Sequence, residues 1–152
     1  MPFCKVTLKT QKPLPSSYPK SLITLGDHIK KKRLDLGLWQ KQVAEQIGVD
    51  EVTLYNWEKQ RTVPKLPYIP KIIAFLAYIP FPPASSLPEK IKNCRRVLGV
   101  TQEKMAEMIG IDKTTLARCE ARKSQPTEKT LKLIETFFGS FCPENKILNR
   151  AG

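Results

Sequence analysis

Apolar residues recur at helical spacing in two stretches of the chain. In the first stretch, the spacing predicts one helix that begins near residue 25 and a second that begins near Gln40. The apolar faces of these two helices are formed by Leu25, Ile29, Leu36, Val43, Ala44 and Ile47. Gly48 suits the end of the second helix, and Asp50 is a favourable N-cap for a third. A fourth helix, rich in apolar residues, is predicted over residues 68–78.

The second stretch repeats the first at an offset of 62 residues. Residues 25–64 and 87–126 align without a gap and share 16 identities in 40 positions, and the fourth helix recurs over residues 128–138. A period this long suits a duplicated domain better than a solenoid. The sequence Ser86–Glu89 has the pattern of a capping box before the first helix of the second stretch, and Thr24–Asp27 approximates the same pattern.

The repeat predicts two helical units. We expect the first unit to span residues 24–79 and the second to span residues 86–140. The proline-rich segment between them, residues 80–85, is predicted to be a stiff, extended linker. A basic arm rich in proline and lysine precedes the first unit over residues 1–23, and a tail follows the second over residues 141–152. Within each unit the short turn "GVD" or "GID" joins the second and third helices, which is helix-turn-helix spacing.

The charge of the chain bears on its partners. The 152 residues include 26 Lys and Arg but only 14 Asp and Glu, which gives a net charge of +12. Such a balance is typical of proteins that meet nucleic acid or another anionic surface, although it also serves solubility alone. No apolar run reaches the roughly 18 residues of a membrane span, and the N-terminus lacks the apolar core of a signal peptide. These features predict a cytoplasmic protein with no membrane partner.

Candidate chemistry is sparse. The four cysteines form no CxxC pair and the chain has one histidine, which argues against a zinc cluster and favours reduced thiols. No nucleophile–base pattern and no phosphate-binding loop appear. We therefore expect neither an enzyme nor a cofactor or metal site.

Both units resemble the lambda-repressor-like, Xre/Cro-type helix-turn-helix domain. The resemblance rests on the series Gln40-x-x-x-Ala44-x-x-x-Gly48-Val49-x-x-x-x-Leu54-x-x-x-Glu58 and on its copy from Gln102 to Glu120. It implies an all-α fold made of two tandem bundles with four to five helices each. It also implies that the third helix of each bundle lies in the major groove of double-stranded DNA, which is wide enough for one helix.

The resemblance assigns DNA contacts residue by residue. In the first unit, the residues that the third helix would present to the DNA bases are Glu51, Val52, Tyr55 and Asn56. In the second unit, the equivalent set is Lys113, Thr114, Ala117 and Arg118. Because the two sets differ, the units are not expected to read the same bases. The start of the second helix and the segment after the third would contact the DNA backbone through Gln40, Lys59, Arg61, Thr101, Gln102, Arg122, Lys123 and Ser124.

Other positions have structural interpretations. The resemblance implies that salt bridges join the first helix to the end of the third, as the pairs Arg33–Glu58 and Arg95–Glu120. Trp57 falls on an apolar helical face, and the repeat places the smaller Cys119 in the same slot. The second unit is therefore expected to be less well packed, unless the gap is filled by Met105, Met108 or Phe138.

Position 39 departs from the family. Members often carry a hydroxyl or amide there to cap the second helix, and Thr101 fits this role in the second unit, whereas Trp39 has no side-chain acceptor. Packing and contact with the DNA backbone both remain open for Trp39.

The leading interpretation is a sequence-specific, repressor-like transcriptional regulator with two reading heads on one chain, in the cytoplasm and on the nucleoid of a bacterium. The alternative is an antitoxin or protein-interaction module in which one unit has lost DNA binding; Trp39 and Glu51 are the features that allow it. RNA binding is open from charge alone, but no aromatic stacking motif supports it. A homodimer or a protein partner also remains open.

Overall fold

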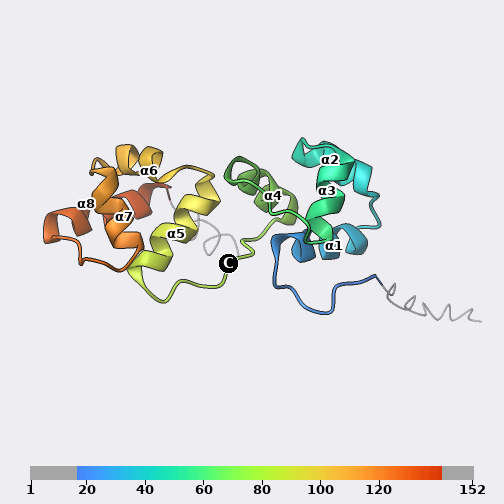
Figure 1. The fold of residues 1–152 in the computed structure, drawn as a ribbon, viewed down its shortest axis with the longest axis horizontal. Coiled ribbons are helices and arrows are strands. Elements are labelled where there is room, and N and C mark those ends of the chain that lie inside the picture. The colour runs from blue at the N-terminus through green and yellow to red at the C-terminus, as the bar shows by residue number, and fades with distance from the viewer. Residues whose placement is uncertain (1–16, 142–152) are drawn as a thin grey trace, which may run out of the picture.

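The structure is a computed structural model that describes residues 17–141. Most of the expected arm (residues 1–23) and tail (residues 141–152) lies outside the described residues. Within residues 17–141 there are eight α-helices, one 3-10 helix and no strand, which confirms the predicted all-α fold (Figure 1). None of these helices is long and apolar enough to cross a membrane.

The helices follow the predicted repeat. The first unit contains α1 (Leu25–Asp35), α2 (Gln40–Ile47), α3 (Glu51–Glu58), the 3-10 helix η1 (Leu66–Tyr68) and α4 (Ile69–Leu76). The second unit contains α5 (Leu87–Leu98), α6 (Gln102–Ile109), α7 (Lys113–Glu120) and α8 (Glu128–Phe141). The predicted fourth helices were placed at 68–78 and 128–138. The first is shorter because Ala77 turns into the left-handed conformation, and the second runs three residues further.

Each unit has a hydrophobic core of its own. The buried residues of the first core are Ile29, Val43, Ala44, Ile47, Leu54, Trp57, Ile72 and Leu76. Those of the second core are Ile91, Cys94, Met105, Ala106, Ile109, Leu116, Cys119, Ile134 and Phe137. The periodicity placed Ile29, Val43, Ala44 and Ile47 on apolar faces, and all four are in the core, whereas Leu25 is only half-buried and is not part of it. Leu36 was expected on the core face of the first helix, but α1 ends at Asp35 and the Leu36 side chain is 53% exposed.

The first helix of each unit is capped differently from the prediction. Thr24 and Asp27, expected only to approximate a capping box, form a complete one: Thr24 Oγ1 accepts from Asp27 N at 3.2 Å and Asp27 Oδ2 accepts from Thr24 N at 2.9 Å. Ser86, expected to cap α5, makes no capping hydrogen bond. Glu89 instead accepts from the backbone and hydroxyl of Ser85, at 2.9 and 2.8 Å, because its side chain reaches one residue further back.

In the second core, Cys119 stands at the position that Trp57 occupies in the first. In the first unit Trp57 is buried, and its ring centroid lies 5.7 Å from that of Tyr68. Of the three candidates to fill the gap in the second unit, Met105 is fully buried, Phe138 packs partly buried against the core and Met108 is exposed. Hollows border both positions, of about 440 Å³ beside Cys119 and about 640 Å³ beside Trp57, so they do not mark the second unit as the less well packed.

Candidate nucleic-acid interface

The helix-turn-helix is built in the same way in both units. Gly48 and Gly110 end α2 and α6 in the left-handed conformation, with φ of 82° and 83°, which a residue with a Cβ rarely adopts. The amides of Gly48 and Val49 both donate to Ala44 O, at 2.8 and 2.9 Å. The chain therefore reverses within three residues and starts the next helix at a fixed angle.

An aspartate fixes the start of each third helix. Asp50 accepts from Thr53 N at 2.8 Å, and Asp112 accepts from Thr114 N at 2.7 Å. The pKa of the Asp50 carboxyl group is lowered mainly by the hydrogen bond from the Thr53 hydroxyl. The pKa of the Asp112 carboxyl group is lowered mainly by the hydrogen bond from the Thr114 amide. Both caps are thus ionised at neutral pH, where they stabilise the positive helix N-terminus.

The side chains predicted to meet the bases lie on the outer side of α3 and α7. In the first unit Glu51 and Val52 are exposed, and Tyr55 and Asn56 are half-buried. In the second unit Lys113, Thr114 and Arg118 are exposed, and Ala117 is half-buried. Lys113 Nζ lies 3.5 Å from Glu103 Oε2 on α6, but both side chains remain well exposed, so that a phosphate or base can displace the carboxylate.

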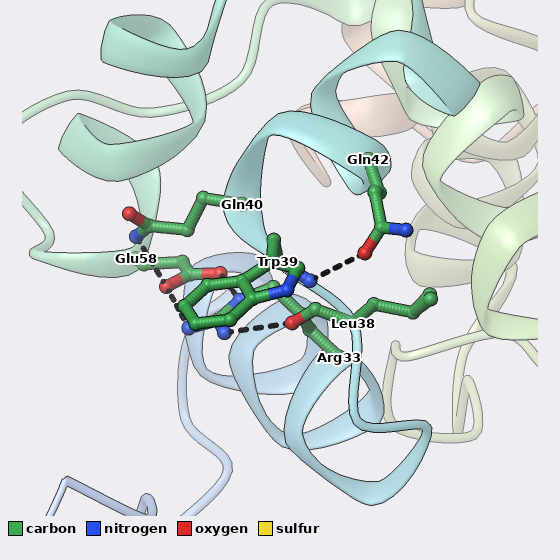
Figure 2. A network of polar contacts seen from close by, with 6 residues as sticks. All are labelled: Arg33, Leu38, Trp39, Gln40, Gln42 and Glu58. Carbon is green, nitrogen blue, oxygen red and sulfur yellow. Dashed lines mark hydrogen bonds and ion pairs between the residues drawn. The ribbon is translucent and has the colours of Figure 1, made fainter.

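A bracket of three side chains holds the first unit's helix-turn-helix against α1 (Figure 2). Arg33 Nε and Nη2 donate to the two oxygens of Glu58 at 2.7 and 2.8 Å, and Arg33 Nη1 donates to Leu38 O at 3.2 Å. Gln40 Nε2 donates to Glu58 Oε2 at 2.9 Å. The Glu58 carboxylate is buried, so these donors replace the water that it loses.

The second unit repeats the bracket with the equivalent residues. Arg95 donates to Glu120 at 2.9 and 3.3 Å, and Gln102 Nε2 donates to Glu120 Oε2 at 2.7 Å. The resemblance assigned Gln102 to the DNA backbone and did not indicate its bond to the glutamate. One N–H of the amide is used in that bond, and the residue as a whole is half-buried.

The caps of α2 and α6 differ as predicted. Thr101 Oγ1 accepts from Lys104 N at 3.2 Å. Trp39 makes no side-chain capping bond; its backbone amide donates to Gln42 Oε1 at 2.8 Å instead. The Trp39 side chain is 77% exposed, so it does not pack into the core.

The segments after α3 and α7 carry cations in different arrangements. Lys59 and Arg61 both lie over the ring of Tyr55, with their charged atoms 5.8 and 5.5 Å from its centroid. These two exposed cations and the half-buried aromatic ring form one cluster at the end of α3. Lys123 and Ser124 are exposed after α7.

Arg122 makes hydrogen bonds within the second unit that the resemblance did not indicate. Its Nη2 donates to Glu89 Oε1 at 2.7 Å and to Ser86 Oγ at 3.2 Å, at the start of α5. The equivalent residue in the first unit is Gln60, which has the same φ of 58° and donates to Asp27 Oδ1 at 3.0 Å. Both side chains tie the end of the third helix to the start of the first, a link that the resemblance did not indicate.

Comparison with known families agrees with this geometry. A family model described as helix-turn-helix matches the chain twice, over residues 29–81 and 91–141. The chain therefore belongs to the Xre- and lambda-repressor-like helix-turn-helix family, a family of DNA-binding domains that act in transcription regulation, and it carries two such regions in tandem. Searches of curated proteins and of solved structures gave no match.

Proposed function

We propose that the protein is a sequence-specific regulator of transcription, of the repressor type, that binds double-stranded DNA with both units. The observation that carries this proposal is the duplicated bracket. In each unit an arginine–glutamate–glutamine set locks the helix-turn-helix onto the first helix and leaves only the outer side of α3 or α7 exposed.

The proposed contacts follow from that exposure. Base edges would be met by Glu51, Val52, Tyr55, Asn56, Lys113, Thr114, Ala117 and Arg118. Backbone phosphates would be met by Gln40, Lys59, Arg61, Thr101, Gln102, Lys123 and Ser124. Arg122, whose side chain is 64% exposed in its ion pair with Glu89, would meet a phosphate as well. The partner is duplex DNA, the chain acts without a cofactor, and its place is the cytoplasm of a bacterium.

A second candidate function has one observation in its favour. Trp39 and Val52 are exposed apolar side chains at the start of α2 and in the first turn of α3, and Glu51 beside them repels phosphate. A protein partner would bury such a surface more readily than DNA would. In this alternative the first unit binds protein, as in an antitoxin, and only the second unit binds DNA.

Selection from a random pool of duplexes tests the proposal. The full chain is expected to enrich one sequence motif, and competition with the same sequence as RNA should not displace the selected DNA. Replacing Trp39 and Val52 with serine should leave protein co-purification unaffected if DNA is the partner of the first unit. Recovery of no motif, together with a co-purified protein lost on those replacements, favours the alternative.

A further inference from the structure

Two residues with branched aliphatic side chains are buried although they belong to neither core. Ile69, the first residue of α4, is 5% exposed, and Val97, near the end of α5, is 8% exposed. Neither is among the buried residues of the two core clusters. The structure places α4 against α5, across the boundary between the units, as well as against α1 and α2 (Figure 1). Apolar side chains are therefore withdrawn from water on both sides of this boundary.

The two backbones approach closely at Gly99, the residue that ends α5. A Cβ atom added there would lie 2.7 Å from Pro70 Cγ and 2.9 Å from Leu66 O. Carbon atoms do not pack at such distances, so only glycine fits between η1, the start of α4 and the end of α5.

The linker is attached to the second unit along α5. Asn93 is buried, and its Nδ2 donates to Pro82 O at 3.0 Å. The Arg96 guanidinium lies 5.5 Å from the ring centroid of Phe81. A proline-rich chain with few backbone conformations, tied down at two successive residues, leaves little freedom between the units.

The repeat shows that the face of α5 is specialised. The positions in α1 equivalent to Asn93 and Val97 are Lys31 and Asp35. Those two residues form an exposed ion pair, with 3.0 Å between Lys31 Nζ and Asp35 Oδ2. The same helical face is thus charged and solvated in the first unit, but neutral and buried in the second.

The opposite side of the boundary shows the same contrast. The positions in α8 equivalent to Leu66 and Pro70 are Glu128 and Lys132, which form an exposed ion pair with 2.9 Å between Lys132 Nζ and Glu128 Oε1. Gly37, the equivalent of Gly99, has no atom within 4 Å of the place where its Cβ would be.

We propose that the two units dock head to tail into one rigid body through the face of η1 and α4 on one side and the face of α5 on the other. A head-to-tail contact repeats indefinitely when both faces recur on every unit. Here the outer copies of the two faces are the ion pairs Lys31–Asp35 and Glu128–Lys132, which stop the assembly at two units.

The docking has a consequence for DNA, which rests on the proposed function. Rigidly docked units hold α3 and α7 at one separation and one relative rotation. The ligand is then a duplex with two unlike half-sites at a single spacing. A DNA whose half-sites are moved apart can engage only one unit at a time and loses the gain from linkage, about 10²-fold or more in affinity.

A glycine pair provides the test of docking, without DNA. Gly99→Ala and Gly37→Ala change residues with nearly equal φ, 67° and 66°, so both pay the same backbone strain. Only Gly99→Ala brings a Cβ against Pro70 and Leu66. NMR relaxation of the full chain should give one rotational correlation time for both units in the natural sequence and in Gly37→Ala. In Gly99→Ala the two units should show shorter, separate correlation times.

Unequal correlation times for the two units of the natural chain would overturn the docking outright, whatever the variants do. Val97→Asp gives α5 the aspartate that α1 has at the equivalent position, Asp35. It provides a second variant if Gly99→Ala fails to fold. It should separate the units, whereas Glu128→Gln on the outer face should not. If the correlation times of both units in a folded Val97→Asp variant are as long as in the natural chain, that result also counts against the proposal.

A spacing series tests the consequence. Half-sites from the selected duplex are moved apart in steps of one base pair through a full turn of about 10 base pairs. The natural chain should bind the duplex with one spacing about 10²-fold more tightly than the others. The affinities of Gly99→Ala for the different spacings should differ by less than this. A flat series overturns the fixed spacing. If the natural chain tumbles as one body but binds no duplex, the proposed function fails while the docking stands.

Discussion

Arg33 holds both carboxylate oxygens of Glu58, at 2.7 and 2.8 Å, with the carboxylate side chain only 2% exposed. The pair joins α1 to the last residue of α3, and Gln40 adds a third donor from α2. Three helices therefore meet at one buried charge, and the position of the outer face of α3 depends on it.

Arg33→Ala should lower the free energy of unfolding by about 3–5 kcal/mol, because it leaves the Glu58 charge buried with Gln40 as its remaining side-chain donor. Chemical denaturation of the full chain measures this loss. Lys31→Ala is the matched control, since it removes the exposed partner of Asp35 on the same helix and should cost less than about 1 kcal/mol. Equal losses for the two variants would contradict the structural role of the bracket.

Much of the fold could be predicted because the repeat doubles each signal. Helical spacing, the glycines that end α2 and α6 and the aspartates that cap α3 and α7 all recur at the same offset. Leu36 was misplaced because periodicity gives no helix end, and α1 stops one residue before it. Ser86 is the N-cap residue of α5 as predicted, but the capping box does not form, because a carboxylate side chain can reach either of two adjacent residues and Glu89 bonds to Ser85.

Contacts between residues far apart in the sequence were harder to predict. The bond between Arg122 and Glu89 joins α5 to the residue after the third helix's C-cap, and no pattern of spacing indicates it. The burial of Val97 could have been noticed, because a valine replaces the aspartate of the other unit at that position. The residues of the DNA face follow from the family resemblance and the exposure of α3 and α7; which of them touch DNA remains a prediction.

Binding to duplex DNA should weaken steeply with salt. If six to ten Lys or Arg side chains displace counterions from phosphates, affinity falls by about 10³–10⁵ between 50 and 200 mM salt. Titration of a labelled duplex at several salt concentrations gives the slope. The variant Lys123→Ala should reduce that slope by about one phosphate contact, and a flat profile would be inconsistent with the proposed interface.

The single histidine should make stability depend on pH in a narrow window. The pKa of His28 is lowered mainly by burial and further by the nearby charge of Lys31, whereas Asp27 raises it. His28 Nδ1 lies 2.8 Å from Tyr78 Oη. Since the folded state holds the proton less tightly than the unfolded state, the stabilising contribution of neutral His28 is present above about pH 6.5. It is lost as pH falls through the lowered folded pKa.

An NMR titration of the His28 ring should therefore give a pKa below the usual value of about 6.5. Denaturation at pH 7.5 and pH 5 supplies the second measurement. His28→Gln should lose less stability than the natural chain over this interval, because it has no proton to gain. A folded-state pKa above the usual value would reverse the sign and defeat the prediction.

The last prediction concerns which unit supplies the specificity of binding. Arg118 and Lys113 on α7 are exposed donors suited to the acceptors of guanine, and Thr114 offers a methyl group to thymine. On α3, Glu51 is repelled by phosphate unless it accepts from a cytosine amino group. Tyr55 is already covered by the charged groups of Lys59 and Arg61, so it is less available to a base. We therefore expect the second unit to contribute more of the discrimination between sequences, and the first to contribute affinity.

Arg118→Ala in the full chain should weaken binding to the selected duplex by about 1–3 kcal/mol and relax the requirement for one base pair, because a bidentate contact to one base would be lost. Lys123→Ala, also exposed and close to α7, is the matched control: it should weaken selected and unselected duplexes alike. Tyr55→Ala should cost less than Arg118→Ala. Binding curves of all three variants against the selected duplex and its single-base-pair mutants separate these effects. The opposite order, with Tyr55→Ala relaxing a base pair and Arg118→Ala leaving every duplex unaffected, would assign specificity to the first unit.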